Sequence, residues 1–550
     1  MNKDLFTVII GGKAGQGTNK AGSVAAHIFS EMQRDVFQMN DYPSLIRGGH
    51  NFSVISSSVG PLRSHYLEAN LVIALDKQSV DAHRGHLSQN GILVVNSDDV
   101  KGTGIGIPIT TESKKYSDPM LISGLASIAI LAAAIGLSKE DLIETIKKEY
   151  KRNLEENIAF STAIYLTAEK SIDHPFTIKK GAEKKKSMTG NEAIALGAIA
   201  GGLDLYFAYP MTPSTSILHF YAVHGKRFGI TAMQPENEIA VANMAIGATF
   251  AGARVMVATS GGGFGLMQEA FSLAGMVEAP VLFYLGQRPG PSTGVPTYTE
   301  QGELRYALNP GHGEFPRIVA SPGSVEEAFY LTSELLSIIW RFQTPGILLT
   351  EKHLAETTMS VFLDPEKSAW AEPLMHSAGE FLRYRDTPNG ISPLLFPPSP
   401  SVIKWSSYEH NEQGLTTEKP EEIARMHDKR RKKLSSLIEY LKTIRTVNVL
   451  GEGEPFIFTF GSTTMSVLEA LEYGDISATV IQPVYLEPFP VWAFEKYRGK
   501  QGIVIEMNST GQLATILHDK IGVELQALIQ KYDGRPFTPT ELASKIKEVR

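Results

Sequence analysis

Residues 255–290 read VMVATSGGGFGLMQEAFSLAGMVEAPVLFYLGQRPG. An apolar run ends in a glycine-rich turn, a stretch with helical spacing of apolar residues follows, and a second apolar run ends in another glycine-rich turn. Two parallel strands need a crossover connection, which is usually a helix. This stretch therefore predicts an α/β fold built on a parallel sheet.

The same alternation extends in both directions along the chain. It continues through residues 189–351 and recurs in 1–172 and 448–550. A basic stretch without apolar periodicity, 173–188, is expected to be a solvated linker. An irregular, Pro-rich segment that closes with a charged helix, 352–447, connects to the last part. The sequence thus predicts three α/β domains on one chain.

Composition narrows the possible functions. The net charge of −7 gives no basic surface for nucleic acid. No apolar run approaches the roughly 20 residues that a membrane span needs. The absence of cysteine excludes disulfides, a zinc–thiolate site, a catalytic thiol and a cysteine-ligated iron–sulfur cluster in this chain. It also favours, weakly, a cytoplasmic location.

A glycine-rich turn, GGKAGQG at 11–17, follows the first predicted strand. Backbone N–H groups in such a strand-to-helix turn can bind a phosphate, and Asp41 lies near where a ribose-binding acid would follow. However, the dinucleotide pattern is imperfect and the phosphate-binding Gly-Lys-Ser/Thr pattern is missing. A purely structural tight turn remains the alternative. Similarly, Arg47 in RGGH (47–50) is either an anion ligand or a solvated turn residue.

Two polar motifs follow strands of the central domain. In YPMTPS (209–214), two prolines stiffen a turn at a strand end and orient Thr212, which could otherwise be a helix N-cap. In ENE (236–238), Glu238 opens a helix, where the helix dipole favours carboxylates. A buried carboxylate there could instead bind a cofactor nitrogen. Glycine-rich loops at 260–263 and 286–294 suggest that the backbone approaches a ligand.

Taken together, these motifs resemble one enzyme family. The chain is similar to the α subunit of thiamine-diphosphate-dependent 2-oxoacid:ferredoxin oxidoreductases, with a γ domain fused at its N-terminus. The resemblance rests on YPMTPST, QPENEIAVANMAIGATFAGARVMVATSGGGFGLMQEAFSLAGM, GQRPGPSTGVPTYTEQGEL and HGEFPR in the centre, on FGST, QPVYLEPFP and EMNSTGQL near the C-terminus, and on GGKAGQG and RGGHN near the N-terminus. It covers nearly the whole chain.

The resemblance implies a domain for each part of the chain. Residues 1–172 correspond to the γ domain, 189–351 to the pyrimidine-binding domain for thiamine diphosphate, and 448–550 to a transketolase-C-terminal-like domain. The implied reaction is oxidative decarboxylation of a 2-oxoacid to acyl-coenzyme A and CO2, with electrons passed to ferredoxin or flavodoxin.

The resemblance also implies roles for individual residues. Glu238 corresponds to the glutamate that binds N1′ of the aminopyrimidine ring and assists removal of a proton, and Thr212 to a threonine that contacts substrate and cofactor. Further cofactor contacts fall on Tyr209, Pro210, Gly261 and Gly262, substrate contacts on Arg288 and Tyr298, and coenzyme A contacts on Gly12, Gly15, Gly17 and Arg47.

The resemblance further implies a second chain. The GDG motif that binds diphosphate through Mg²⁺ is missing, as is cysteine for a [4Fe-4S] cluster. Both groups are therefore expected on a β subunit, with no metal site on this chain. The active site is expected between α and β subunits, in an assembly of two of each.

Two positions depart from the family pattern. Tyr298 and Leu394 stand where many relatives carry arginines, the first of which is associated with the substrate carboxylate; tyrosine and leucine cannot replace such bidentate binding. Either Arg288, Arg305 or a β-subunit residue takes over, or the substrate differs, or the pattern is too narrow. His410 has no assigned role.

Other functions remain open. A non-oxidative thiamine-dependent decarboxylase or transketolase-like enzyme would lack the cluster. A dinucleotide-binding regulatory module would explain only residues 11–17, and a non-catalytic scaffold would explain neither Thr212 nor Glu238.

Overall fold

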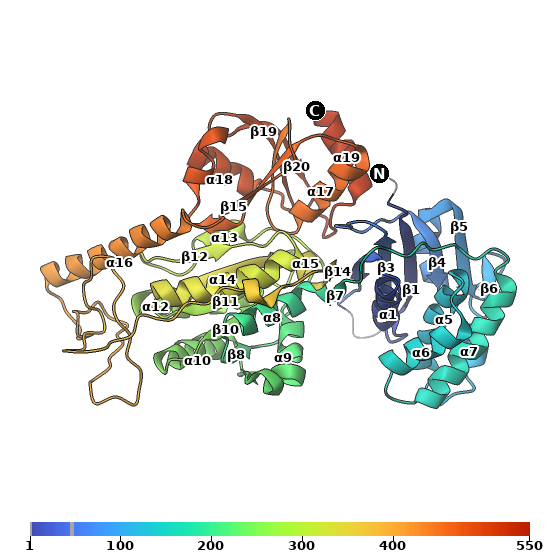
Figure 1. Ribbon diagram of the computed structural model, residues 1–550, viewed down its shortest axis with the longest axis horizontal. Helices are drawn as coiled ribbons and strands as arrows, with labels where there is room; N and C mark the ends of the chain where they lie inside the picture. The colour runs from blue at the N-terminus through green and yellow to red at the C-terminus, as the bar shows by residue number, and fades with distance from the viewer. Residues whose placement is uncertain (1–2, 45–48) are drawn as a thin grey trace. The chain divides into compact units, whose positions relative to one another are not determined.

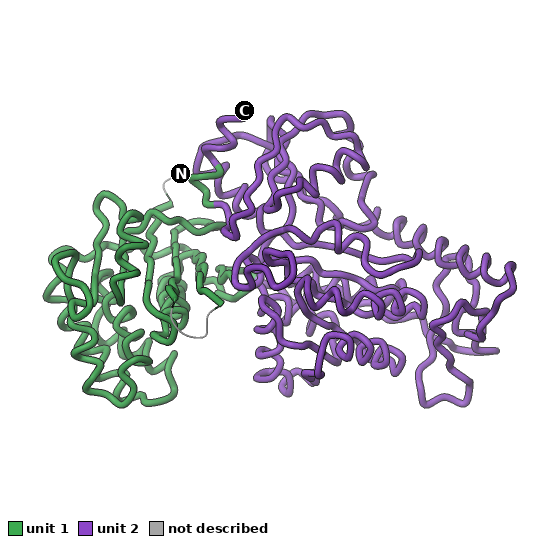
Figure 2. Tube along the Cα trace, turned by 180° about the vertical axis from the view of Figure 1, so that it is seen from behind, with its two compact units in different colours: residues 1–189, 356–362, 538–542 green, residues 190–355, 363–537, 543–550 purple. Residues whose placement is uncertain are grey.

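The computed structural model describes residues 3–44 and 49–550, so Arg47 lies outside the described part. The chain forms two compact units (Figure 2). The first holds residues up to Thr189 together with 356–362 and 538–542, and the second holds the remainder. In the described ranges, no helix is long and apolar enough to cross a membrane.

An eight-stranded sheet forms the core of the first unit (Figure 1). Its strands, in spatial order, are β6 (Ile105–Ile107), β5 (Leu87–Asn96), β4 (Ala69–Ala74), β1 (Phe6–Lys13), β3 (His50–Ser58), β2 (Asp35–Asp41), β14 (Thr358–Val361) and β7 (Lys186–Thr189). The longer helices are α1 (Thr18–Glu31), α5 (Leu125–Ala134), α6 (Lys139–Glu149) and α7 (Leu154–Ser171). Their apolar side chains and those of the sheet form one buried cluster.

Only part of this sheet is parallel. Strands β1, β4, β5 and β6 pair in parallel, as the sequence predicts. Strand β3 instead runs antiparallel to both β1 and β2. Residues 42–49 connect β2 to β3. This connection is too short for the two strands to run parallel, because a parallel return needs a crossover of a dozen or more residues.

Residues 173–188 are the stretch expected to be a solvated linker. The C-terminal half of this stretch is bound to the first unit. Gly181 donates its N–H to Met32 O at 3.0 Å, and Lys185 pairs with Asp35 at 2.8 Å. Its last residues form β7, which pairs with β14 from a distant part of the chain. Local composition contains no signal for this pairing, because the partner strand lies far along the sequence.

The second unit contains a seven-stranded sheet. Its spatial order is β18 (Tyr485–Glu487), β12 (Ile318–Ala320), β13 (Gly346–Glu351), β11 (Val281–Gln287), β10 (Val255–Thr259), β8 (Leu205–Ala208) and β9 (Thr231–Met233). All pairs are parallel except β12–β18. The predicted β–α–β unit at 255–290 is confirmed as β10, two helices and β11.

Helices cover both faces of this sheet, because successive strand residues point to opposite faces. Met256 and Leu282 belong to a buried cluster with α8 (Gly190–Ala200), α9 (Thr215–Phe228) and α14 (Val325–Phe342). Val257 and Phe283 face the cluster of α10 (Glu238–Phe250), α11 (Gly261–Leu266), α12 (Gln268–Met276) and α13 (Leu304–Leu308). Figure 1 shows α14 running along the sheet.

A five-stranded sheet forms the C-terminal part of the same unit. Its order is β15 (Val447–Leu450), β17 (Thr479–Pro483), β16 (Phe456–Phe458), β19 (Gln501–Glu506) and β20 (Glu524–Gln530). Helices α17 (Thr463–Gly474) and α18 (Gln512–Ile521) pack on it, and α19 (Pro539–Val549) ends the chain. Because β18 leaves this region to join the seven-stranded sheet, the two sheets share one unit.

The segment between these sheets is anchored by buried charge. On α16 (Pro420–Leu441), Lys429 and Lys433 both bind the carboxylate of Glu278. Burial raises the pKa of Glu278, but the two ammonium groups outweigh it and lower the pKa below its usual range. Nearby, the rings of His410 and Tyr384 are in contact, with centroids 3.7 Å apart and planes tilted by 37°. The charged helix is thus fixed to the domain core.

Candidate functional site

The predicted motifs meet at one edge of the seven-stranded sheet. Tyr209–Ser214 follows β8, Glu236–Glu238 follows β9, Ser260–Gly263 follows β10, and Arg288 follows β11. These strands are parallel, so all four loops leave from their carboxyl ends, where ligands bind in open α/β sheets.

Glu238 is a buried carboxylate that does not cap its helix. It is the first residue of α10 and is 3% exposed. The N-cap is Asn237, whose Oδ1 accepts the N–H of Ala240 at 3.0 Å. Glu238 Oε1 has no hydrogen-bond partner. Since an unsatisfied buried oxygen costs about 1–3 kcal/mol, this atom is available to accept a further hydrogen bond.

Glycine at 263 leaves room for this carboxylate. A Cβ there would lie 2.5 Å from Glu238 Oε1 and 2.1 Å from Thr259 Oγ1. Both distances are too short for any side chain. Thr259 Oγ1 in turn lies 3.8 Å from the sulfur of Met211, in the YPMTPS turn. The loops after β8, β9 and β10 therefore converge around Glu238.

Arg288 links the YPMTPS turn to the loop after β11. Its Nη1 donates to the carbonyl oxygen of Thr212 at 3.0 Å. Burial lowers the pKa of Arg288, and the nearby carboxylate of Glu303 opposes that shift. Thr212 is not a helix cap, because the N-cap of α9 is Ser214. The alternative interpretation, that Thr212 is the N-cap of the following helix, is therefore wrong.

A second buried carboxylate lies beside these groups and has no assignment from the sequence. A Cβ on Gly261 would fall 1.4 Å from Glu303 Oε1, while Glu303 Oε2 is buried without a partner. The backbone N–H of Glu303 donates to Gln287 Oε1 at 2.9 Å. Burial raises the pKa of Glu303 to about 8, opposed by Arg288 and reinforced by Glu300. Its position in TEQGEL, a loop with several polar residues, gives no local signal of burial.

The other predicted residues of this site are more exposed. The Tyr209 side chain is 38% exposed and Pro210 is half-buried. Gly262 is exposed, with open space where a Cβ would stand. Tyr298 lies under the guanidinium of Arg535, which is 3.7 Å from the ring centroid. By contrast, Leu394 is buried in the apolar cluster that includes side chains of α8, α9 and α14.

The glycine-rich turn of the first unit is tightly packed. A Cβ on Gly12 would lie 2.6 Å from Gln16 Oε1, which accepts the N–H of Lys13, and Gly15 has a φ of +94°. These contacts support a tight turn. Gly17, however, lines a pocket of about 470 Å³ together with Lys20, among others.

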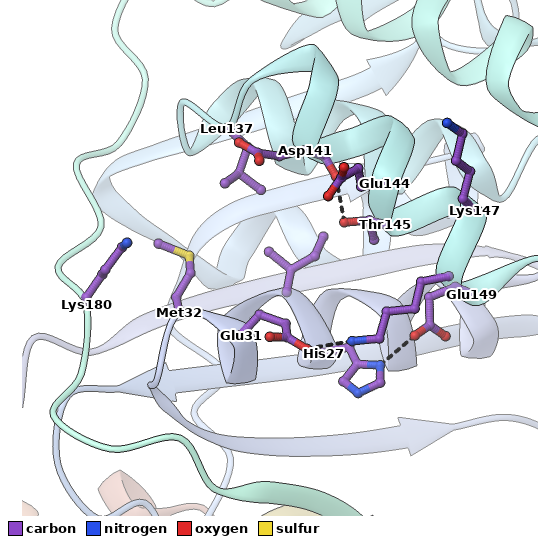
Figure 3. A pocket seen from close by; sticks show the side chains of 12 residues that line it. His27, Glu31, Met32, Leu137, Asp141, Glu144, Thr145, Lys147, Glu149 and Lys180 are labelled. Atoms are coloured by element: carbon purple, nitrogen blue, oxygen red, sulfur yellow. Dashed lines mark hydrogen bonds and ion pairs between the residues drawn. The ribbon is translucent and has the colours of Figure 1, made fainter.

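Another pocket of the first unit, about 800 Å³, lies between α1, α6 and the stretch around Lys180 (Figure 3). His27 and Glu149 point toward one another, with 2.6 Å between Nδ1 and Oε1, and Glu31 pairs with Lys148 at 2.6 Å. The predicted site residues are absent from its described lining. Four carboxylates, three lysines and His27 line this pocket, so its lining is of mixed charge rather than cationic.

Comparisons with known proteins agree with this geometry. Residues 196–429 match a family model described as the thiamine-diphosphate-binding part of pyruvate flavodoxin/ferredoxin oxidoreductases, and residues 7–166 match one described as pyruvate ferredoxin/flavodoxin oxidoreductase. The chain is 30% identical to the 2-oxoacid:ferredoxin oxidoreductase α subunit of Saccharolobus solfataricus, over 98% of this chain and 97% of that one. The chain belongs to the 2-oxoacid:ferredoxin oxidoreductase α-subunit family.

Two further matches extend over the whole chain. An α subunit of this family from Aeropyrum pernix is 29% identical over 99% of this chain and 97% of its own. A solved structure of 2-oxoglutarate:ferredoxin oxidoreductase from Magnetococcus marinus, with 2-oxoglutarate, coenzyme A and succinyl-coenzyme A bound, superimposes with a TM-score of 0.89 at 28% identity, covering 99% of both chains. The chain is therefore an oxidoreductase subunit with the family's α/β architecture.

Proposed function

We propose that this chain is the fused γ and α part of an enzyme that converts a 2-oxoacid and coenzyme A to acyl-coenzyme A and CO2. The C1–C2 bond of the acid breaks, a thioester forms with the thiol, one proton is released, and two electrons reduce two ferredoxin or flavodoxin equivalents. The proposal rests on family membership and, within the structure, on Glu238, whose buried carboxylate has an unpartnered oxygen.

Glu238 fits the pyrimidine end of thiamine diphosphate. When bound, this cofactor supplies a nucleophilic carbon for the 2-oxo group. An N–H at ring nitrogen N1′ is a suitable donor for Glu238 Oε1, and the carboxylate would hold the proton at that atom. Gly261 and Gly262 would allow the backbone after β10 to approach the cofactor, and Tyr209 and Pro210 would border it. Gly263 keeps space for the carboxylate.

Thr212 and Arg288 would position the substrate. The carbonyl of Thr212 is held by Arg288, which fixes the turn that carries the Thr212 hydroxyl. Tyr298 belongs to the loop that begins at Arg288 and would border the acid from the other side. Arginine binds carboxylates in a bidentate manner, so Arg288 is suited to an anionic substrate once ligand entry reorganises its contacts.

Coenzyme A is assigned to the first unit. Gly17 lies at a pocket whose described lining includes three cations, Lys20, Lys151 and Arg152, and three carboxylates, Asp118, Glu149 and Glu156, of which Glu149 pairs with Lys20. The cations are suited to phosphate groups. Gly12 and Gly15 would shape the turn that leads to it. Arg47 is assigned to the same ligand from the sequence, although it lies outside the described residues.

A β subunit would complete the active site. Apolar side chains are exposed on the elements around Glu238: Met233 on β9, Ile239 and Met244 on α10, and Leu266 on α11. Such a group of exposed apolar side chains is typical of a protein interface. The β subunit would also hold Mg²⁺ and the [4Fe-4S] cluster, since this chain has no cysteine. Two chains of each kind are expected, in the cytoplasm.

The corresponding domain assignment is 1–172 for the γ domain, 189–351 for pyrimidine binding and 448–550 for the transketolase-like domain.

Two measurements test the proposal on the complex with its β subunit. Titration calorimetry should detect thiamine diphosphate binding that is weakened in Glu238→Gln. Iron and sulfide analysis should find a cluster. A cofactor-binding complex without iron would support the non-oxidative alternative instead.

A further inference from the structure

Two loops of the second unit are joined beside Tyr298. Thr299 donates its N–H to Gly534 O at 3.1 Å, which binds the loop after β11 to the loop after β20. Gly534 has a φ of +80°, and a Cβ there would lie 3.2 Å from Tyr298 Cβ. The close approach therefore depends on glycine.

This junction places Arg535 on the ring of Tyr298. The guanidinium carbon lies 3.7 Å from the ring centroid. The backbone N–H of Arg535 donates to Asp533 Oδ1 at 2.9 Å, and Asp533 in turn pairs with Lys531 at 3.1 Å. A planar guanidinium stacked on an aromatic face directs its five N–H donors outward, within its own plane. The stack thus fixes the orientation of a long, exposed side chain.

The position of Tyr298 makes this orientation relevant to the substrate. Tyr298 lies on the loop that begins at Arg288, and Arg288 is bound to Thr212 O. Arg288 is buried and lies near Glu303. Arg535, by contrast, is exposed.

We propose that Arg535, oriented by Tyr298, binds a carboxylate group of the 2-oxoacid and contributes to substrate selectivity. This inference rests on the proposed function, because it needs an anionic substrate. A 2-oxoacid always carries one carboxylate beside the oxo group, and a dicarboxylic acid carries a second. Five donors allow Arg535 to bind a carboxylate in addition to any protein partner.

The test uses the complex with its β subunit, assayed with pyruvate and with 2-oxoglutarate. In Arg535→Ala, KM for the 2-oxoacid should rise about tenfold or more, because a hydrogen bond to a charged group is lost, while kcat and KM for coenzyme A stay within about twofold. Arg535→Lys should recover only part of the loss, since it keeps the charge without the planar fork. Tyr298→Ala should raise the same KM, because it removes the ring that orients Arg535.

Arg498→Ala is the matched control, because Arg498 is an exposed arginine of the same unit whose side chain pairs with Glu495. A rise for both acids identifies the carboxylate beside the oxo group, and a rise for 2-oxoglutarate alone identifies the distal one. Unchanged KM for both acids in Arg535→Ala, in a complex that turns them over, would overturn the inference. A wild-type complex inactive with every 2-oxoacid would instead refute the proposed function.

Discussion

Asn237 and Glu238 are adjacent at the start of α10, yet only Asn237 caps the helix. Its side chain accepts the Ala240 N–H, whereas the carboxylate of Glu238 is buried with an unpartnered Oε1. The helix end is already satisfied by a neutral cap. The helix end therefore does not need the Glu238 carboxylate as its cap, and the unpartnered Oε1 is consistent with the proposed role in cofactor binding.

Replacing Glu238 tests this interpretation. In Glu238→Gln, we expect kcat to fall by about 10²–10⁴-fold, because an amide cannot hold the cofactor proton. Thermal unfolding of the chain should change little, since glutamine occupies the same volume. The neighbouring exposed residue offers a control: Glu236→Gln should retain wild-type turnover. Comparable losses in both variants would remove the special role of Glu238.

Substitutions at Gly262 and Gly263 test the effects of ligand approach and of packing separately. Gly263→Ala places a Cβ within 2.5 Å of Glu238 and should lower both the melting temperature and cofactor binding. Gly262→Ala meets open space, so it should leave the melting temperature unchanged and weaken thiamine diphosphate binding alone. Differential scanning calorimetry and cofactor titration measure the two effects. Normal cofactor affinity in Gly262→Ala would remove that residue from the proposed site.

Glu303 predicts a pH dependence of stability. Its pKa is raised from 4.5 to about 8, so between these values the folded chain keeps a proton that the unfolded chain releases. The free energy of unfolding should therefore contain a contribution that declines as pH rises through this window. In Glu303→Gln that contribution should vanish, as measured by melting temperature from pH 5 to 9. An equally steep decline in the variant would contradict the raised pKa; Glu269→Gln, at an exposed site, is the control.

The buried charges around α16 predict a large stability effect. Glu278→Gln leaves Lys429 and Lys433 buried beside a neutral amide, and it should lower the free energy of unfolding by about 3–5 kcal/mol. Asp386→Asn removes the partially exposed partner of Lys432 and should cost at most about 1 kcal/mol. Denaturant unfolding of the two variants compares them directly. Equal effects would show that the buried cluster contributes no more than a surface pair.

Local patterns predicted the parts of this fold that depend on neighbouring residues. The β–α–β unit at 255–290 follows from the spacing of apolar residues and glycine turns, and its loops lie at the carboxyl edge as expected. The same patterns could not reveal that β18 joins the seven-stranded sheet or that β14 pairs with β7. Those pairings join distant segments and leave no mark on local periodicity.

In the candidate site, too, some residues could be identified from local sequence and others only from the structure. Glu238 and Thr212 were identified from motifs. The structure places Glu238 in the first turn of α10, as the alternative interpretation expected, but also shows that its side chain is buried; it places the N-cap of α9 at Ser214 rather than Thr212. Glu303 looked like an ordinary polar loop residue until its burial against Gly261 was visible. Arg535 was not singled out, because its relation to Tyr298 exists only in three dimensions.

The most direct test of the central claim is viologen reduction by this chain co-expressed with its β subunit. The assay contains thiamine diphosphate and a panel of pyruvate, 2-oxoglutarate, branched-chain and aryl 2-oxoacids, with and without coenzyme A. We predict reduction with at least one acid that depends on coenzyme A and is lost in Glu238→Gln. A complex that holds cofactor and cluster but reduces viologen with none of these acids would contradict the account.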